Sequence, residues 1–503
     1  MLPRIAHGAA RRFGEATAYV APTGWTLSYE ELDRRSDRVA AGLRHRRVGI
    51  GDVVSLVLPP GPEYLVAYLA AAKVGAITAG VNHRLAPTER GAILALAAPV
   101  LVLAGAGLVP SDSTLRVEEI EPAPSAATLL AGFQRDDDVP PLADDPDRDV
   151  AIIFTSGTTG LPKGARYTNR QLEFITATDV GEQWGGGVRS FGGTSFAHLG
   201  FMTKLAGSMK RGGTTFIMEH WRARLALELL EREQMTSVAG VPTQLALMLA
   251  DPEFDRFDLT AVRAIIVGGG PITPATATEA RARFGAALST RYSCTEAGIG
   301  LGTAFDDPEE DAVVSVGRPH PSVDLAVLDA DDHAVAAGEV GHVCLRSPAV
   351  MAGYWNDAEG TRAAFTESGH VRTGDLGWVD DQGRLRLVGR SKEMYVRGGY
   401  NVYPVEVEAV VSTHPDVAAV AIVPRADPVM GEIGVAVVVP HPGHPSPTLA
   451  ELRNFAADRL GRHKLPEDLR VVNALPLTPA EKIDRRALTA SVAAATDAAA
   501  ARG

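Results

Sequence analysis

VAIIFTSGTTGLPKG, residues 150–164, is an apolar run followed by a loop rich in glycine and hydroxyl groups. The apolar part, 150–154, is typical of a buried strand. Glycines in the loop allow backbone N–H groups to turn toward an anion, and four hydroxyls and one lysine add side-chain donors. The sequence therefore predicts a phosphate-binding loop. Its candidate residues are Thr155, Ser156, Gly157, Thr158, Thr159, Gly160 and Lys163.

This loop differs from the P-loop of nucleoside triphosphatases. A P-loop has glycine before its lysine and serine or threonine after it, whereas Pro162 and Gly164 flank Lys163. A glycine-rich surface loop without a ligand is the alternative interpretation. The length of the motif and its position after a predicted strand argue against that alternative.

Apolar runs of four to six residues alternate with helical patterns from about residue 53 to residue 290, which indicates a mostly parallel sheet covered by helices. In one such unit a strand at 264–267 leads into Gly268, Gly269, Gly270 and Pro271, and a helix capped by Thr273 ends at Gly285. Ligands of such sheets bind beyond the carboxyl ends of the strands. Gly269, Gly270 and Pro271 therefore join the candidate nucleotide site.

The sequence pattern changes after Arg390. A short helix at 404–412, strands at 417–423 and 434–439, and a helix at about 448–460 predict a separate small α+β domain. The expected fold is α/β, with a large N-terminal domain (1–390) built of subdomains with mostly parallel sheets and a small, mobile C-terminal domain (391–503). The alanine-rich end, 491–503, is expected to be a frayed helix or a loose tail.

Length and charge narrow the function classes. A chain of 503 residues exceeds what one core supports, and its net charge of −12 argues against nucleic acid as a partner. Two cysteines form no disulfide framework and no paired metal-ligand spacing, which suits a reducing cytoplasm. The uncharged stretch 91–110 is interrupted by Pro99, so we interpret it as a helix followed by a buried strand rather than a membrane span.

Two further stretches carry oxygen ligands. YSCTE, residues 292–296, places a carboxylate beside a hydroxyl, which suits Mg²⁺ because this cation prefers oxygen ligands and keeps water and substrate phosphates in its shell. RTGDLG, residues 372–377, places the acceptor-only carboxylate of Asp375 on an expected tight turn. A ribose diol offers two donors to such a carboxylate, so Asp375 is the candidate ribose ligand.

Together with GRSKE (389–393) and PLTPAEKIDRR (476–486), these stretches resemble the motifs of the adenylate-forming superfamily. That superfamily includes acyl-CoA synthetases, luciferases and the adenylation domains of peptide synthetases. The resemblance covers nearly the whole chain, with the motifs in the order typical of the family.

The resemblance implies a role for each motif. Glu296 would hold the metal, Thr295 would contact the α-phosphate, and Tyr292 would lie along the adenine, with Ser293 where the family has glycine. Arg390 would contact ribose or phosphate, Lys392 would be the hinge between the domains, and Lys482 would be the catalytic lysine. One position departs from the family, because Glu481 replaces the glycine that usually precedes this lysine. An acid there is expected to pair with Lys482 or to restrict the loop.

Two more regions are assigned by the same resemblance. Gly398, Gly399 and Tyr400 belong to a glycine turn entering a helix, which would form the pantetheine channel for CoA, and a purely structural turn is the alternative. FAHLG, residues 196–200, would flank the carboxyl group of the acid, with His198 either lining the site or taking part in catalysis. The candidate acyl-pocket residues are His198, Gly240, Gly268, Gly298 and Gly300. Recurrent glycines and the lack of Lys or Arg between Cys294 and Phe305 predict a wide pocket for a lipophilic monoacid.

The implied function is an ATP- and Mg²⁺-dependent acyl-CoA synthetase in the cytoplasm, acting on a fatty acid, an aryl acid or a bulky alicyclic acid of steroid or terpenoid type. Its partners would be the carboxylic acid, ATP and CoA. Two alternatives stay open: an enzyme that stops at the acyl-adenylate or loads a carrier protein, and a noncatalytic nucleotide-binding protein of the same fold. The residues leave the oligomeric state open, a homodimer included.

Overall fold

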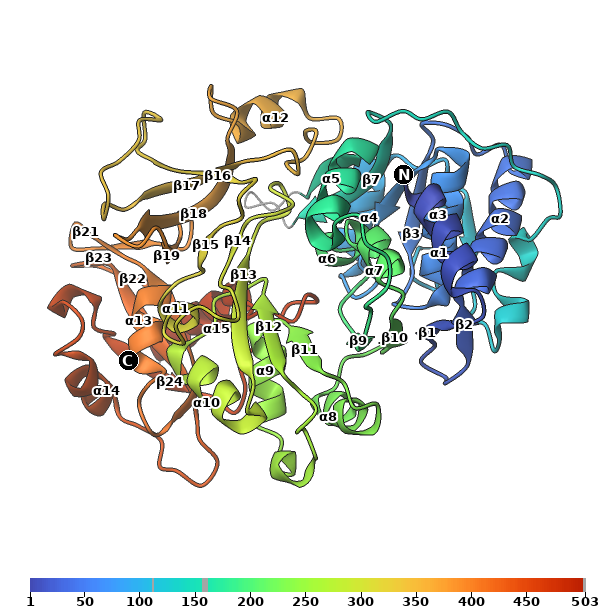
Figure 1. The fold of residues 1–503 in the computed structure, drawn as a ribbon. Helices are drawn as coiled ribbons and strands as arrows, with labels where there is room; N and C mark the ends of the chain where they lie inside the picture. Colours follow the sequence, from blue (N-terminus) through green and yellow to red (C-terminus); the bar gives the residue numbers. More distant parts are fainter. Residues whose placement is uncertain (111–112, 156–161, 501–503) are drawn as a thin grey trace.

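Five sheets, each covered by helices, make up the computed structural model, which describes residues 1–110, 113–155 and 162–500, with side chains up to Ala495. Figure 1 shows the N-terminal sheets and helices in blue to green on one side and the orange-to-red C-terminal sheet on the other. The architecture is mixed α/β with several mostly parallel sheets and a small C-terminal unit, which confirms the fold class predicted from the sequence.

The first large sheet has the strand order β6-β5-β3-β4-β7-β8 and is parallel except for its last pair. Its strands are β3 (Val53–Val57), β4 (Ile77–Gly80), β5 (Leu101–Ala104), β6 (Val117–Glu119), β7 (Asp149–Thr155) and β8 (Lys163–Thr168). The helices of this region are α1 (Leu2–Phe13), α2 (Tyr29–His45), α3 (Pro62–Val74), α4 (Pro87–Ala97) and α5 (Asn169–Val180). Helix α3 is buried on nearly all faces because its alanine, leucine and tyrosine side chains offer no polar face to water.

A smaller sheet of order β2-β1-β10-β9 adjoins this region. Its elements are β1 (Thr17–Val20), β2 (Thr26–Ser28), β9 (Arg189–Gly192) and β10 (Thr214–Ile217), with α6 (Leu199–Met202) and α7 (Leu205–Arg211) between β9 and β10. Helix α4 ends at Ala97 and β5 begins at Leu101, as expected for the proline-interrupted apolar stretch. Within the described part of the chain, no helix combines the length and apolar character needed to cross a membrane.

The sheet that positions the site has the order β11-β12-β13-β14-β15. Its elements are β11 (Ser237–Gly240), β12 (Ala264–Gly268), β13 (Ala287–Tyr292), β14 (Leu301–Gly302), β15 (Arg318–Pro319), α8 (Ala223–Arg232), α9 (Pro242–Leu249), α10 (Pro274–Phe284) and α11 (Asp311–Val314). The predicted capping of α10 is confirmed, since the Thr273 hydroxyl accepts from the backbone N–H of Thr276 and Gly285 ends the helix at φ 62°.

An antiparallel sheet of order β16-β17-β18-β19 follows. It contains β16 (Asp324–Leu328), β17 (Gly341–Arg346), β18 (Val371–Val379) and β19 (Leu385–Arg390), with α12 (Ala358–Ala364) beside it. The structure corrects one expectation here, because Asp375 lies inside the long strand β18 rather than on a tight turn. Gly374, at φ 77°, and a register shift after Leu376 bend this strand, and the bend accounts for the turn-like sequence.

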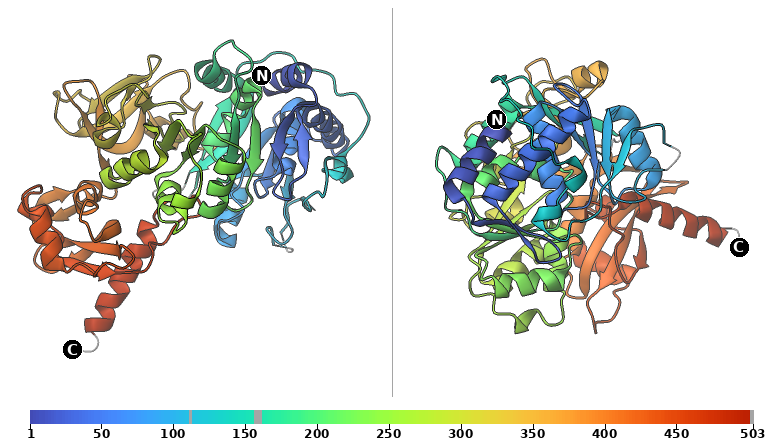
Figure 2. Two further views of the ribbon diagram at one scale, coloured as in Figure 1. Left: turned by 60° about the horizontal axis from the view of Figure 1, so that its bottom comes forward. Right: turned by 90° about the vertical axis from the view of Figure 1, so that its right-hand side faces the viewer.

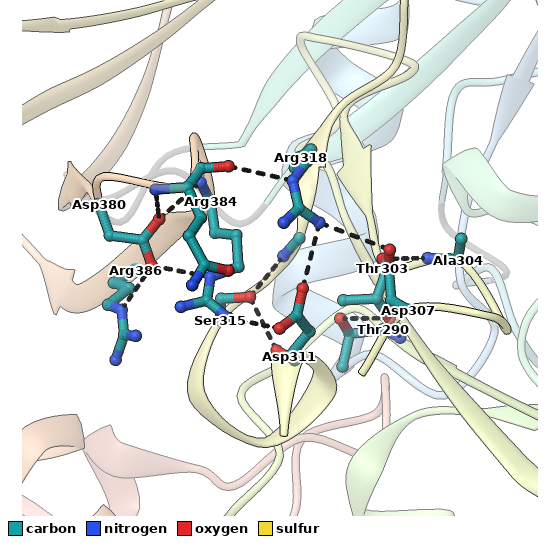
Figure 3. A network of polar contacts seen from close by, with 12 residues as sticks. Thr290, Thr303, Ala304, Asp307, Asp311, Ser315, Arg318, Asp380, Arg384 and Arg386 are labelled. Carbon is teal, nitrogen blue, oxygen red and sulfur yellow. Dashed lines mark hydrogen bonds and ion pairs between the residues drawn. The ribbon is translucent and has the colours of Figure 1, made fainter. Parts of the chain in front are cut away.

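A buried ionic network joins the last two sheets (Figure 3). Asp311, at the start of α11, has no exposed surface and binds Arg384, and also Arg318 at 3.1 Å. Arg384 binds Asp380 at 2.8 Å, so the network reaches the turn between β18 and β19. Burial by itself would raise the pKa of Asp380, but hydrogen bonds from Arg384 and Arg386 hold that pKa at about 2. The network therefore fixes the two strands that carry Asp375 and Arg390 against the sheet that carries Tyr292.

The C-terminal sheet has the order β21-β20-β23-β22, with β24 beside β23 and a core of its own. Its elements are β20 (Tyr395–Arg397), β21 (Tyr400–Val402), β22 (Val417–Asp427), β23 (Gly431–Pro440), β24 (Asp468–Val471), α13 (Pro404–Val411), α14 (Leu449–Ala456) and α15 (Arg485–Ala500). Helix α15 begins before the predicted tail, and its Leu488 and Val492 pack against β22 and β23, whereas 501–503 lie outside the described residues. The far end of this helix projects from the body of the protein (Figure 2).

Candidate active site

Asp375 is the centre of a polar cluster at the carboxyl end of β13. The hydroxyl of Tyr292, the last residue of β13, donates to Oδ2 of Asp375 at 2.7 Å. Nε of Arg390 lies 3.1 Å from Oδ1 of the same carboxylate. The structure therefore brings together Tyr292, expected along the adenine, Asp375, expected at the ribose, and Arg390, expected at the ribose or a phosphate.

The second cluster surrounds Glu296. The hydroxyl of Tyr354 donates to Oε1 of Glu296 at 2.8 Å, and Nζ of Lys163 lies 4.7 Å from the centre of the Tyr354 ring. The hydroxyl of Tyr167 donates to the backbone oxygen of Thr295 at 2.5 Å. Tyrosines from β8 and from the segment before α12 therefore hold the Thr295–Glu296 pair beside the lysine of the glycine-rich loop.

The glycine-rich loop connects two antiparallel strands. Thr155 ends β7 and pairs in register with Lys163, which begins β8. The calls on Ser156, Gly157, Thr158, Thr159 and Gly160 fall outside the described residues. Lys163, at the described end of the loop, therefore lies close to Tyr354, which in turn contacts Glu296.

The donor set around Glu296 fits a magnesium ion that takes most of its ligands from elsewhere. Glu296 offers one half-buried carboxylate, and the neighbouring Thr295 adds a hydroxyl. In the described ranges, no group of three or more His, Cys, Asp or Glu side chains is arranged to hold a metal ion. A site with one carboxylate suits Mg²⁺, which usually keeps waters and substrate phosphates as its other ligands.

Lys482 reaches this site from the C-terminal sheet. Its Cε lies 3.9 Å from the position that a Cβ on Gly269 would occupy, so the side chain approaches the loop after β12. The side chain is exposed, yet surrounding protein and the cation of Arg390 lower the pKa of Lys482, and Asp375 opposes this shift. Lys482 from the C-terminal segment therefore adds a second cation near the ion pair that Asp375 and Arg390 form between β18 and β19.

The structure corrects the expected partner of Glu481. Its carboxylate binds Nη1 of Arg84 at 3.1 Å and accepts from Nε2 of Gln244 at 2.5 Å, rather than pairing with Lys482. The backbone of Glu481 has φ 61°, the left-handed conformation that favours glycine. Glutamate therefore occupies a glycine-like position in this chain and extends its side chain into the larger domain.

His198 is a neutral neighbour of the site. Asn82 accepts at Oδ1 from the backbone N–H of Arg84 and directs Nδ2 toward Nε2 of His198 at 3.3 Å. Because an amide nitrogen only donates, this geometry makes Nε2 the acceptor. Burial and the cation of Lys482 lower the pKa of His198 to about 4, so its ring is uncharged at neutral pH.

The glycines of the expected acyl pocket do not all border open space, which corrects the inference from their number. A Cβ on Gly298 would lie 2.4 Å from the backbone oxygen of Ala349, and one on Gly300 would lie 2.1 Å from that of Tyr292. Gly268 faces the backbone of Arg291, and Gly240 faces the side chain of Gln244. These glycines permit close packing, so their number does not measure a cavity.

The glycine turn expected to contact CoA lies on the C-terminal domain, between β20 and β21. Gly398 and Gly399 have φ 54° and 86°, which are the two positive values of a tight hairpin turn. Tyr400 starts β21, so a short strand separates this turn from α13, and its ring stacks on His463 at 4.7 Å. The expected hinge residue, Lys392, lies between β19 and β20.

Comparison with known proteins identifies this arrangement. The AMP-binding enzyme family model matches residues 7–355, and the model of the AMP-binding enzyme C-terminal domain matches residues 406–482. The chain belongs to the AMP-binding enzyme family. It is therefore an AMP-forming acid–thiol ligase, as the sequence motifs predicted.

Curated relatives share this family over nearly their whole length. The chain is 32% identical to a fatty acid–[acyl-carrier-protein] ligase of Streptomyces coeruleorubidus, with 94% of this chain and 93% of that protein aligned. It is 30% identical to a 4-coumarate–CoA ligase of Petroselinum crispum, with 94% and 90% aligned. It is 31% identical to a long-chain fatty acid–CoA ligase of Mycobacterium tuberculosis, with 93% of each aligned.

Solved structures show the same fold. The amide bond synthetase McbA of Marinactinospora thermotolerans superposes with a TM-score of 0.85 at 27% identity, covering 98% of this chain and 100% of that one. ATP-bound MatB of Rhodopseudomonas palustris superposes with a TM-score of 0.86 at 26% identity, covering 98% and 99%. The likeness extends through the C-terminal sheet.

Sequence reasoning missed residues that contact the candidate site residues of this AMP-binding enzyme or the Glu481 that adjoins Lys482. Among them are Asn82, Arg84, Tyr167, Gln244 and Tyr354. Their only local signal is a polar or aromatic side chain near a predicted strand end. Their partners lie between 58 and 397 positions away in the chain, so no spacing rule connects them.

Proposed function

We propose that this AMP-binding enzyme is an acyl-CoA synthetase that activates a lipophilic carboxylic acid through an acyl-adenylate. The observation that carries the proposal is the approach of Lys482 to Gly269 in the loop after β12, because it joins the C-terminal segment to the sheet whose strand β13 carries Tyr292, the hydrogen-bond partner of Asp375. In this proposal Asp375 accepts from the ribose hydroxyls, Tyr292 borders the adenine, and Gly269, Gly270 and Pro271 line the nucleotide.

In the first half-reaction an oxygen of the acid attacks the α-phosphorus of ATP, the bond to the bridging oxygen breaks, and pyrophosphate leaves. Lys482 provides a positive charge between the attacking carboxylate and the α-phosphate, where negative charge accumulates. Lys163 and the glycine-rich loop hold the phosphates that leave. Glu296 would bind Mg²⁺, which would neutralise phosphate charge, and Tyr354 keeps this carboxylate in place.

In the second half-reaction the sulfur of CoA, having lost its proton, attacks the acyl carbonyl, and AMP leaves. We propose that residues 391–503 rotate about Lys392, so that the Gly398–Gly399 turn replaces Lys482 at the site. Rotations of this kind are a common way for enzymes to gate successive steps. In the present arrangement Lys482 lies at the site and Tyr400 is 59% exposed, which corresponds to the adenylating state.

Fatty acid and coumarate ligases among the relatives support a lipophilic acid. Near His198, Phe196 stacks on Phe201 at 3.8 Å and the ring of Tyr64 meets both rings edge-on, so the segment that carries His198 rests on an apolar core. In the described contacts, Arg291 beside Gly268 donates only to backbone oxygens. A cation at this position would suit an acid with a distal polar group, so such an acid is included in the test.

The test is a panel of acids read by two assays. Pyrophosphate release with acid and ATP alone measures adenylation, and thioester formation after CoA is added measures the second step. We expect medium- to long-chain, aryl or bulky alicyclic acids to exceed short linear acids and dicarboxylic acids by at least about 10-fold in kcat/KM, as expected when several methylene groups are buried. Preference for short linear acids would contradict a lipophilic pocket.

The same assays separate the alternatives. Acyl-AMP accumulation without any CoA thioester would favour an enzyme that loads a carrier protein, the activity named for the Streptomyces relative. That outcome would overturn the CoA assignment. ATP binding with no pyrophosphate release for any acid would favour a noncatalytic nucleotide-binding protein.

Asp375→Asn is expected to raise the KM for ATP about 10- to 100-fold. The amide keeps the shape of the side chain but removes the charge that faces Arg390 and that would accept from the ribose, and a hydrogen bond to a charged group is worth about 1.5–3 kcal/mol. Steady-state pyrophosphate release measures the effect. Asp324→Asn, an exposed change in the same sheet, is the control, and equal KM values for the two variants would contradict the role of Asp375.

A further inference from the structure

Glu481 connects the two domains immediately beside the proposed catalytic lysine. Its side chain is only 11% exposed, and its two carboxylate oxygens have different partners in the N-terminal domain. Oε1 pairs with Nη1 of Arg84, in the segment before α4, and Oε2 accepts from Nε2 of Gln244 on α9. Gln244 is itself 3% exposed, so this contact is shielded from water.

The loop that carries Glu481 is held on its own side as well. Leu477 and Ile483 form an antiparallel bridge, and the backbone N–H of Thr478 donates to the oxygen of Lys482 at 2.7 Å. Glu481 sits in this closed turn at φ 61°, a conformation that costs glutamate free energy and costs glycine little. Such strain persists when surrounding contacts offset it, and the bonds to Arg84 and Gln244 are those contacts.

The cleft next to this connection shows that the contact lies between domains rather than inside one core. Arg84, Trp221, Arg222, Leu247, Leu477 and Glu481 line a cavity of about 280 Å³. Leu477 and Glu481 come from the C-terminal domain, and the other four residues come from the N-terminal domain. A rotation of the C-terminal domain would therefore separate Glu481 from both partners at once.

We propose that Glu481 is a positioning residue that, through Arg84 and Gln244, holds Lys482 in the adenylating position and thereby slows the change to the thioester-forming arrangement. This inference rests on the proposed two-step function. Glu481 adjoins Lys482, so a rotation that removed Lys482 from the site would also break the contacts with Arg84 and Gln244, and these contacts would stabilise one of the two arrangements selectively. A residue that interacts more strongly with one of two states shifts the equilibrium toward that state. It therefore favours the half-reaction that this state carries out.

The expected result is opposite changes in the two half-reactions. In Glu481→Gly, single-turnover formation of acyl-AMP should slow about 10-fold, whereas thioester formation from supplied acyl-AMP and CoA should accelerate several-fold. Arg84→Met should change both rates in the same directions without altering the turn that carries Lys482. Glu481→Gln, which keeps the reach toward Gln244, should fall between wild type and Glu481→Gly.

Arg222→Met is the matched control, because it removes the same charge from the same cleft without removing a partner of Glu481. Both half-reaction rates of this variant should stay within about twofold of wild type. Parallel loss of both half-reactions in Glu481→Gly and Arg84→Met would overturn the proposal, because it would indicate general damage to the structure. Unchanged rates in Arg84→Met would also overturn it.

A readout without catalysis keeps this test independent of the proposed function. Amide hydrogen exchange in 476–484 should be faster in Glu481→Gly and Arg84→Met than in Arg222→Met, since both changes remove a partner contact of this segment. Exchange in α9 should be faster in Glu481→Gly, which removes the contact with Gln244. If wild type forms no adenylate with any acid, the proposed function fails, but this exchange difference still tests the contact. Equal exchange in all three variants would overturn the positioning role.

Discussion

Lys482→Ala is expected to slow acyl-adenylate formation about 100- to 1,000-fold, with ATP affinity retained within a few-fold. Lys482 lies beside Gly269 and faces Asp375 and Arg390, where a bound α-phosphate would meet the attacking carboxylate. Its charge matters most when two anions approach each other, so its removal should lower kcat more than it raises KM. ATP keeps its contacts with the larger domain, which explains the small change expected in affinity.

The measurement is single-turnover formation of acyl-AMP, together with ATP binding by calorimetry. Lys464→Ala is the matched control, because Lys464 belongs to the same domain but pairs with Glu406 on the partly exposed side of α13. Thioester formation from supplied acyl-AMP should be nearly normal in Lys482→Ala, since Lys482 has no role in that step. Unchanged pyrophosphate release would show that Lys482 is not the catalytic lysine.

The sequence predicted those parts of the fold and site that depend on neighbouring residues. The capping of α10 follows from Thr273 and Gly285, which lie within one helix length of each other, and the βαβ alternation follows from local periodicity. Within the motifs, Tyr292 and Asp375 were both assigned to the nucleoside, and the structure places them in contact. A motif predicts the role of its residues because the motif is a short, contiguous stretch of the chain.

Contacts between distant segments could not be predicted in the same way. Glu481 was recognised as a departure from the family, yet its partners are 397 and 237 positions away and belong to the other domain. Asp375 resembled a turn residue because Gly374 and Gly377 flank it, whereas strand pairing on both sides keeps it in β18. The glycines of the expected pocket were ambiguous for a related reason, since a missing side chain serves close packing as readily as it opens a cavity.

Asp311→Asn is expected to destabilise the protein by about 3 kcal/mol, the largest stability effect that we expect from one charge-neutralising change. Asp311 is completely buried and binds both Arg384 and Arg318, and Arg384 is only 5% exposed. An amide of equal size leaves Arg384, in a place that water does not reach, with Asp380 as its remaining carboxylate, and it also removes the charge that faces the partly exposed Arg318. Removing one partner of such a pair costs more than the pair itself contributes.

Thermal unfolding should show this loss as a fall of roughly 3 to 5 °C in the first transition midpoint. Asp324→Asn is the control, because its pair with Arg346 is half exposed on both sides and is worth at most about 1 kcal/mol. The double variant Asp311→Asn/Arg384→Met should recover part of the loss, since the buried charge of Arg384, which has lost one of its two carboxylates, is no longer present. A midpoint in Asp311→Asn equal to that of Asp324→Asn would contradict the structural role of the network.

Because the same network fixes β18 and β19, the KM for ATP of Asp311→Asn should also rise at temperatures well below its midpoint. This rise would link the buried pair to the position of Asp375.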